Sequence, residues 1–150
     1  MPTHQSLHLV IHVSTDRRNG ASLALAGSRR QAEDAKRKLD MLCRYRSDYQ
    51  LRLKDGTDPV RIANTRAFID KLDDAIAQQQ REAAACESYS NACFHLVNVE
   101  EKKLRSLEAL RDRRAKEASR VENRREQKRT DEFGARAARS GGATLDFRSA

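Results

Sequence analysis

Aromatic and chain-breaking residues are scarce in this sequence. Its 150 residues include no Trp, three Tyr, four Phe, two Pro and six Gly, and only 38% are hydrophobic. This composition excludes a spherical core of ordinary size. Long uninterrupted windows are filled by Ala, Leu, Arg, Lys, Glu and Gln, which favour helices. The sequence therefore predicts an all-α protein of long helices or a coiled coil.

Long apolar runs are missing as well. No stretch approaches the ~20 apolar residues that span a bilayer, and the opening residues MPTHQSLHLVIHV lack the positive start and cleavage site of a signal peptide. Cys43, Cys86 and Cys93 show no metal-type pairing. We therefore expect a soluble cytoplasmic protein whose cysteines are reduced thiols in a helix seam.

Charge is plentiful and mostly positive. Charged residues make up 35% of the chain, and the formal net charge is +8. Such a chain is attracted to nucleic acid, an anionic membrane or an acidic protein surface, and charge alone does not choose among them.

One strong turn signal, the segment LKDGTDPVR, interrupts the helical pattern. Gly56 suits a left-handed helix stop, Thr57 or Asp58 suits an N-cap, and Pro59 suits the first helical position. We predict a helix over about 6–54, a turn at 55–58 and a helix over about 59–139. Together they form one coiled-coil domain over 1–142, and a flexible tail over 143–150 follows Gly141-Gly142.

A heptad stripe lies on each side of this break. Before it, steps of three and four connect Leu25, Ser28, Ala32, Ala35, Leu39, Leu42, Arg46, Tyr49 and Leu53. After it, the same steps connect Phe68, Leu72, Ala75, Gln79, Glu82, Cys86, Tyr89, Cys93 and Leu96, with Leu104, Leu107 and Leu110 following a shift near 100–103. Two stripes joined by a short turn predict an antiparallel hairpin.

The second helix is expected to outrun the first. The first twenty residues fit both a strand and a helix pattern, and we predict a helix. Pairing outward from the turn then matches residue 42 with about 73, and residue 7 with about 108. Residues 111–139 are left without an intramolecular partner over roughly 40 Å. An isolated helix of this kind is marginally stable, so we expect another molecule to complete it.

Catalytic chemistry finds no support in the sequence. His4, His8 and His12 share a helical face, yet no Cys or carboxylate completes a metal site. Asp70, Asp73 and Asp74 are better explained as a solvated acidic face than as an acid–base pair. A glycine-rich phosphate loop, a nucleophile elbow and a CxxC motif are all missing. We expect no enzyme activity, cofactor or metal.

Two features fit partner binding. Tyr45, Tyr49 and Phe68 gather near the hairpin end, where they either fill the seam or form a partner-facing patch. Residues 101–129 carry twelve Lys or Arg and six Asp or Glu. A nucleic-acid arm usually has fewer acids and more aromatics, so this segment fits protein docking better, although a merely solvated charged helix is also consistent with it.

Four segments make the chain similar to a known family. They are AEDAKRKLDMLCRYRSDYQLRL (32–53), ANTRAFIDKLDDAIAQQ (63–79), LRSLEALRDRR (104–114) and ENRREQKRTDEFGARAA (122–138). With these segments the chain resembles FliJ, the small coiled-coil component of the bacterial flagellar type III export apparatus. The run E-N-R-x-x-Q-K-x-x-D-E-F is the most diagnostic part.

The resemblance implies a non-enzymatic stalk with three kinds of partner. Its terminal helix would enter the pore of a hexameric FliI-type export ATPase through Arg124, Arg125, Gln127, Lys128, Asp131, Glu132 and Phe133. A face near the hairpin end would bind an FlhA-type export gate protein through Leu42, Tyr45, Tyr49, Phe68, Leu72 and Ala75. The family is also credited with escorting export chaperones. This role would place the chain at the cytoplasmic face of the inner membrane, without membrane insertion.

Two alternatives differ in partner. A basic coiled-coil nucleic-acid binder would lose affinity steeply with salt. The equivalent stalk of a virulence-type secretion system would share the architecture.

Overall fold

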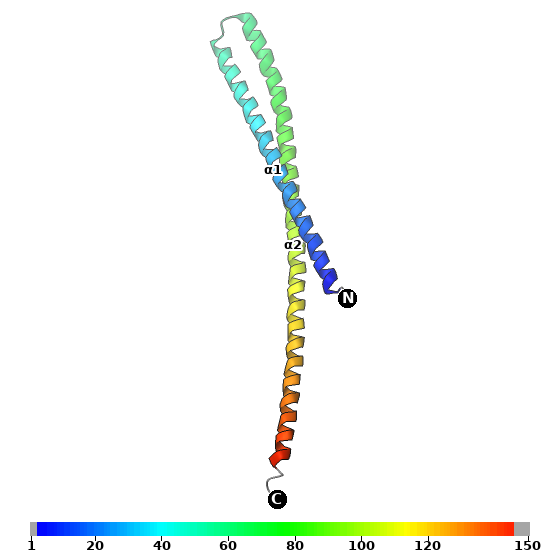
Figure 1. Cartoon of the computed structure of the whole chain (residues 1–150). Coiled ribbons are helices and arrows are strands. Elements are labelled where there is room, and N and C mark those ends of the chain that lie inside the picture. The colour runs from blue at the N-terminus through cyan, green and yellow to red at the C-terminus, as the bar shows by residue number, and fades with distance from the viewer. Residues whose placement is uncertain (1–2, 146–150) are drawn as a thin grey trace. The chain divides into compact units, whose positions relative to one another are not determined.

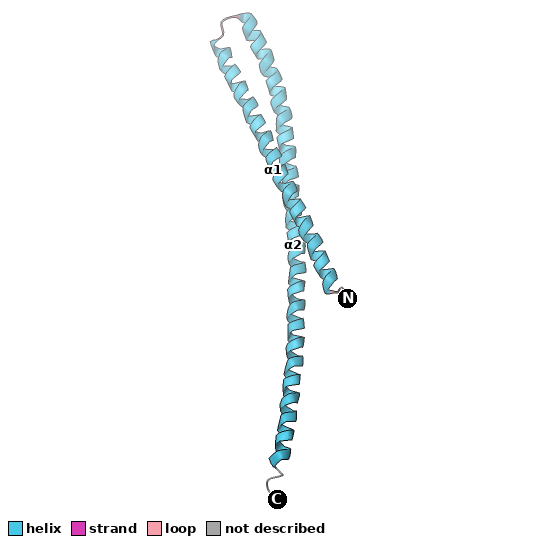
Figure 2. Ribbon diagram, in the orientation of Figure 1, coloured by secondary structure: helices cyan, strands magenta, loops and turns pink. Residues whose placement is uncertain are grey.

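The computed structural model describes the backbone of residues 3–145 and the side chains of residues 3–141, and it is helical almost throughout. Helix α1 spans His4–Asp55 and helix α2 spans Pro59–Leu145, 52 and 87 residues long (Figure 2). Residues 3–145 contain no strand. The all-α prediction with a longer second helix is therefore confirmed. The predicted helix end near residue 139 and the stop at Gly141-Gly142 are wrong, because α2 continues to Leu145, and the rest of the predicted tail, 146–150, lies outside the described residues.

The chain forms two compact units, each with its own packing. One comprises His8–Leu104, which holds most of α1, the turn and the first half of α2 (Figure 1). The other comprises the described residues up to Leu7 together with those from Arg105 onward.

The turn at residues 56–58 is capped largely as the sequence predicts. The Asp58 carboxylate oxygen Oδ1 accepts a hydrogen bond from the Val60 backbone N–H at 3.2 Å. The Asp58 carbonyl accepts a bond from the Ile62 N–H at 3.0 Å, so Asp58 is the N-cap and Pro59 opens α2. The prediction of a left-handed conformation at Gly56 is wrong, because no described glycine has a positive φ. A connection of this length, followed by a helix start that Asp58 caps, reverses the chain without a glycine in the left-handed conformation.

Within the first unit, α1 and α2 pack as an antiparallel hairpin. The Gln79 amide Nε2 donates to the Ala35 carbonyl oxygen at 3.1 Å. Nearer the turn, Arg46 pairs with Asp73, and the rings of Tyr49 and Phe68 lie 4.6 Å apart. These pairs agree to within about one helical turn with the predicted register.

The seam of α1 matches its prediction. All nine predicted positions from Leu25 to Leu53 are buried or half-buried. The same spacing continues toward the N-terminus through Ala21, Arg18, Ser14 and Ile11. Helical periodicity therefore extends through the segment whose pattern also fitted a strand.

The seam of α2 differs from its prediction. Phe68, Glu82, Tyr89 and Leu96 are exposed, and the residue after each of them is buried or half-buried instead. The observed seam is Ile62, Thr65, Ile69, Leu72, Ile76, Gln79, Ala83, Cys86, Ser90, Cys93, Val97, Glu100 and Leu104, with no shift near residue 100.

Side-chain size in α1 explains this difference. Every second seam position of α1 from Ser14 to Ala35 is small, and these four residues, Ser14, Ala21, Ser28 and Ala35, are all buried. Small residues let two helices approach closely, which leaves room for small partners such as Ala83 but not for a tyrosine ring. The Tyr89 ring therefore lies outside the seam, and Ser90 takes the seam position instead.

The second unit buries little. Leu7 is buried, and Leu107 and Leu110 are half-buried. From residue 115 to residue 141 every side chain is exposed. A long amphipathic helix usually has one covered stripe, so this stretch has no core face within the described chain.

Candidate partner-binding surfaces

One side of the hairpin collects the residues next to the seam. A groove is lined by Gln31 and Lys38 of α1 and by Glu82 of α2, which shows that these positions share a side. Seven residues make almost two helical turns, so positions seven apart stay on the same side. We call this side the aromatic flank. It comprises Arg17, Ala24, Gln31, Lys38, Tyr45 and Arg52 of α1, and Arg61, Phe68, Ala75, Glu82, Tyr89, Leu96 and Lys103 of α2.

The predicted gate-binding residues divide between this flank and the seam. Tyr45 and Phe68 are exposed on the aromatic flank, and Ala75 is half-buried beside them. Leu42 and Tyr49 are half-buried seam residues, and Leu72 is buried. Only the flank residues present much surface to a partner, so Leu42 and Leu72 would act by supporting them.

Ring contacts hold the aromatic pair in place. The Tyr49 and Phe68 rings meet at an interplanar angle of 54°, a tilted geometry that aromatic pairs favour. The Arg52 guanidinium lies 5.0 Å from the centre of the Tyr49 ring, close enough for a cation–π contact. The Tyr49 ring therefore supports the Phe68 side chain, which stays exposed on the aromatic flank.

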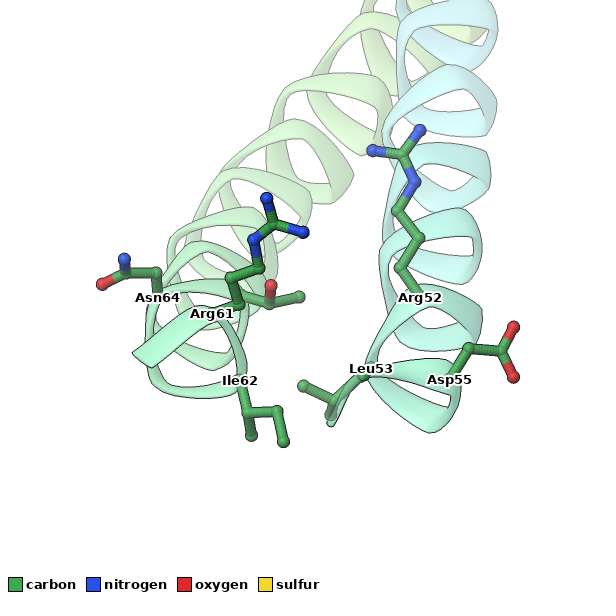
Figure 3. Close-up of a pocket in the computed structure, with 8 residues that line it drawn as sticks. Arg52, Leu53, Asp55, Arg61, Ile62 and Asn64 are labelled. Carbon is green, nitrogen blue, oxygen red and sulfur yellow. The ribbon is translucent and has the colours of Figure 1, made fainter. Parts of the chain in front are cut away.

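A pocket beside the turn extends this surface. Figure 3 shows Leu53 and Ile62 pointing toward each other, with the Arg52 and Arg61 side chains extending from the two facing helices. Asp55 points away from them in this view. The pocket therefore has an apolar floor and a basic rim, and its lining residues are Arg52, Leu53, Asp55, Gly56, Arg61, Ile62, Asn64 and Thr65.

Arg52 and Arg61 are not among the residues predicted from the sequence, although a signal for them exists. Arg52 lies seven residues after Tyr45, and Arg61 lies seven residues before Phe68. The spacing that defines a heptad therefore places both arginines in line with the two aromatic residues.

An ion pair between Arg46 and Asp73 joins the two helices, further from the turn than the ring contact of Tyr49 and Phe68. The Arg46 guanidinium donates a hydrogen bond to the Asp73 carboxylate and also bonds the Gln50 amide oxygen at 3.2 Å. The hydrogen bond that Arg46 donates to Asp73, and then the negative charge of Asp73, raise the pKa of Arg46 above the usual value. Arg46 is a polar seam position that satisfies its charge across the hairpin.

The predicted ATPase-binding residues lie on the fully exposed part of α2. Arg124, Arg125, Gln127, Lys128, Asp131, Glu132 and Phe133 are all exposed. Phe133 is 77% exposed, the largest value among the exposed large hydrophobic residues of the described chain. An aromatic ring held this far into solvent costs apolar burial, which binding to another surface would recover.

Metal-ligating residues do not gather in the part of the chain that the structure describes, where no group of three or more His, Cys, Asp and Glu is placed to hold an ion. His12 Nε2 lies 3.6 Å from the Asp16 carboxylate one turn later. Across residues 3–145, neither helix offers a stretch with the length and apolar character of a membrane span.

Comparison with known proteins assigns the family. The family model described as "Flagellar FliJ protein" matches residues 3–143. The flagellar FliJ protein of Salmonella typhi is 28% identical over 142 residues, covering 92% of this chain and 97% of the relative. The flagellar FliJ protein of Escherichia coli K12 is 27% identical with the same coverage. The chain belongs to the FliJ family, and this membership indicates a component of flagellar export.

Proposed function

We propose that this chain is the non-enzymatic stalk of flagellar protein export and that it docks in the pore of a hexameric FliI-type ATPase. The observation that carries the proposal is the exposed helix from residue 115 to residue 141, which has no covered face. It holds eight Lys or Arg and five Asp or Glu, so an acidic sleeve around it gains favourable charge contacts. Enclosure by a ring would also cover Phe133.

The aromatic flank at the hairpin end is the proposed contact for an FlhA-type gate protein. Tyr45 and Phe68 supply exposed aromatic surface, and Arg52 and Arg61 add a basic rim beside the turn. Aromatic and arginine side chains are the residues that most often dominate binding energy at protein interfaces. Binding there would connect the ATPase to the membrane-embedded gate and place the chain at the inner membrane without inserting it. Escort of export chaperones is part of the same proposal.

The flagellar apparatus is favoured over a virulence-type one. Both relatives named above are flagellar proteins that match over nearly their full length. A nucleic-acid role has less support, because the exposed helix interleaves acids among its bases and holds one aromatic residue, Phe133.

Truncation tests the ATPase contact. The full chain should co-elute with the cognate FliI-type ATPase and stimulate its hydrolysis, whereas a chain ending at Arg120 should do neither. A chain ending at Gly141 is the matched control and should behave as the full chain, because it keeps every predicted contact residue. Full stimulation by the Arg120 truncation would refute the docking assignment.

Two aromatic substitutions test the gate contact. Tyr45→Ala and Phe68→Ala should each weaken binding to the purified gate domain about tenfold or more, as interface anchors do. Phe94→Ala is the control, since Phe94 is an exposed aromatic residue that contacts Arg29 on the other side of the hairpin. Equal losses from all three variants would point to a general folding defect rather than a contact on the aromatic flank.

A further inference from the structure

Two uncharged segments lie across from each other in the middle of the hairpin. Residues 19–28, NGASLALAGS, and residues 88–99, SYSNACFHLVNV, contain no Asp, Glu, Lys or Arg in a chain that is 35% charged. The Arg29 guanidinium lies 5.9 Å from the centre of the Phe94 ring, which places the end of the first segment beside the second. We call these two facing segments, 19–28 and 88–99, the uncharged belt of the hairpin.

The aromatic flank of this belt is apolar and uncovered. Tyr89 and Leu96 of α2 are 58% and 49% exposed, and Val99, one turn further, is 46% exposed. The seam in this part of α2 is formed by Ser90, Cys93 and Val97 instead, which pack near the small residues Ala21 and Ser28 of α1. Contiguous exposed apolar side chains of this kind are typical of an interaction surface.

The α1 side of the same flank is nearly flat. Ala24 lies on the flank, and Gly20 and Gly27 lie one turn to either side of it along the helix. A Cβ added to either glycine would meet nothing within 4 Å, so the backbone there is open to solvent. Small residues at such positions let another helix approach closely.

Charges at the two ends of the belt are arranged with opposite signs. On α2, Glu82 and Lys103 stand seven residues outside Tyr89 and Leu96, and so lie at equal distances from the midpoint between them. On α1, Arg17 lies at the Lys103 end, whereas Asp34 lines the groove with Glu82 at the other end. One end of the belt is therefore basic, and the other carries two acids, Asp34 and Glu82, and one base, Lys38.

We propose that the belt binds a second copy of this chain, with the two hairpins antiparallel and related by a two-fold axis. This arrangement puts α2 against α2 of the second copy, so that Tyr89 packs on Leu96 and Glu82 faces Lys103, each contact occurring twice. It also brings the Gly20–Gly27 segments of the two α1 helices together, where small side chains allow close packing. The inference is independent of the proposed export function.

The positive charges of Arg17 and Lys103 favour the antiparallel arrangement over a parallel one. A parallel dimer would bring Arg17 of one copy beside Lys103 of the other, and like charges at close range oppose association. Lys103 also lies 3.7 Å from Glu100 of its own helix, and at 59% side-chain exposure it still reaches a neighbouring surface. An acidic partner helix would form favourable charge contacts only with Arg17 and Lys103. At the other end, Glu82 and Asp34 would repel it.

Sedimentation equilibrium of the full chain tests the proposal. The wild-type chain should show a reversible monomer–dimer equilibrium across micromolar to millimolar concentrations. Lys103→Glu and Glu82→Lys should each weaken dimerisation about tenfold, because each substitution creates two like-charge contacts. The double variant restores opposite charges and should recover the wild-type dimer constant.

A matched pair of apolar substitutions provides the control. Leu96→Asp should abolish the dimer, whereas Leu23→Asp should leave it unchanged, because Leu23 is 75% exposed and off the aromatic flank. Circular dichroism checks that both variants remain helical. A chain that stays monomeric at every concentration overturns the proposal, as does a dimer that the charge exchange does not restore. A monomer whose belt instead binds a different helical protein also overturns it.

Discussion

The side-chain amide of Gln79 donates a hydrogen bond to the backbone carbonyl oxygen of Ala35 across the hairpin, at 3.1 Å. Both residues occupy seam positions, and Ala35 is buried. A polar side chain in the seam is best satisfied in one register, so this bond helps to fix which turn of α1 faces which turn of α2.

Removing this bond should therefore weaken the hairpin. We expect Gln79→Ala to lower the free energy of unfolding by about 1 kcal/mol, the usual net value of one hydrogen bond. Urea unfolding followed by circular dichroism measures the change. The neighbouring Gln80→Ala is the control, because Gln80 is exposed and should have little effect. Identical midpoints for the two variants would contradict the role assigned to Gln79.

Glu100 is a seam residue that the fold satisfies incompletely. It is 9% exposed, and its Oε2 atom has no hydrogen-bond partner among the described residues. A buried polar atom in this state costs about 1–3 kcal/mol. Glu100→Leu should therefore raise the thermal midpoint, whereas Glu87→Leu, at an exposed position of the same helix, should not. A lower midpoint for Glu100→Leu would show that the carboxylate stabilises the hairpin.

Tyr49 and Phe68 should be energetically coupled. Their rings lie 4.6 Å apart, and aromatic pairs of this kind contribute about 0.5–1.5 kcal/mol beyond the apolar area that they bury. A double-mutant cycle with Tyr49→Leu and Phe68→Leu measures the coupling from the unfolding free energies of the four proteins. Strictly additive single effects would mean that the rings do not stabilise one another.

The ion pair between Arg46 and Asp73 predicts a flat pH profile on the basic side of neutrality. Asp73 raises the pKa of Arg46, so the stability that this shift contributes is fully present below the pKa of arginine in the unfolded chain. It is lost only as pH rises through the higher folded value. The difference in thermal midpoint between the wild type and Arg46→Gln should therefore stay constant from about pH 7 to about pH 10. A difference that shrinks within this range would require another titrating group.

Several elements of the fold follow from local sequence. The N-cap at Asp58 and the helix start at Pro59 are short-range effects of side-chain chemistry, so they are visible in LKDGTDPVR. The seam of α1 is also legible, because Leu and Ala recur there with few competing apolar residues. Gly56 shows the limit of this reasoning, since a glycine permits a left-handed conformation without requiring it.

The candidate surfaces were only partly predictable. Tyr45 and Phe68 were recognisable as unusual aromatic residues near the turn, but Arg52 and Arg61 become a pair only when the two helices face each other around a pocket. The two uncharged segments are visible in the sequence. Which of their side chains are exposed depends on which residues of α2 occupy the seam, and only the structure shows this.

The sequence by itself determined that two long helices form and reverse at one turn, because helix propensity, capping and seven-residue periodicity act over short distances. Only the tertiary structure decided the seam of α2, since Phe68 and Ile69, or Tyr89 and Ser90, fit the same spacing almost equally well. Opposite the small residues of α1, close packing admits Ser90 and excludes the Tyr89 ring, whereas Phe68 lies beside the seam and contacts the ring of Tyr49.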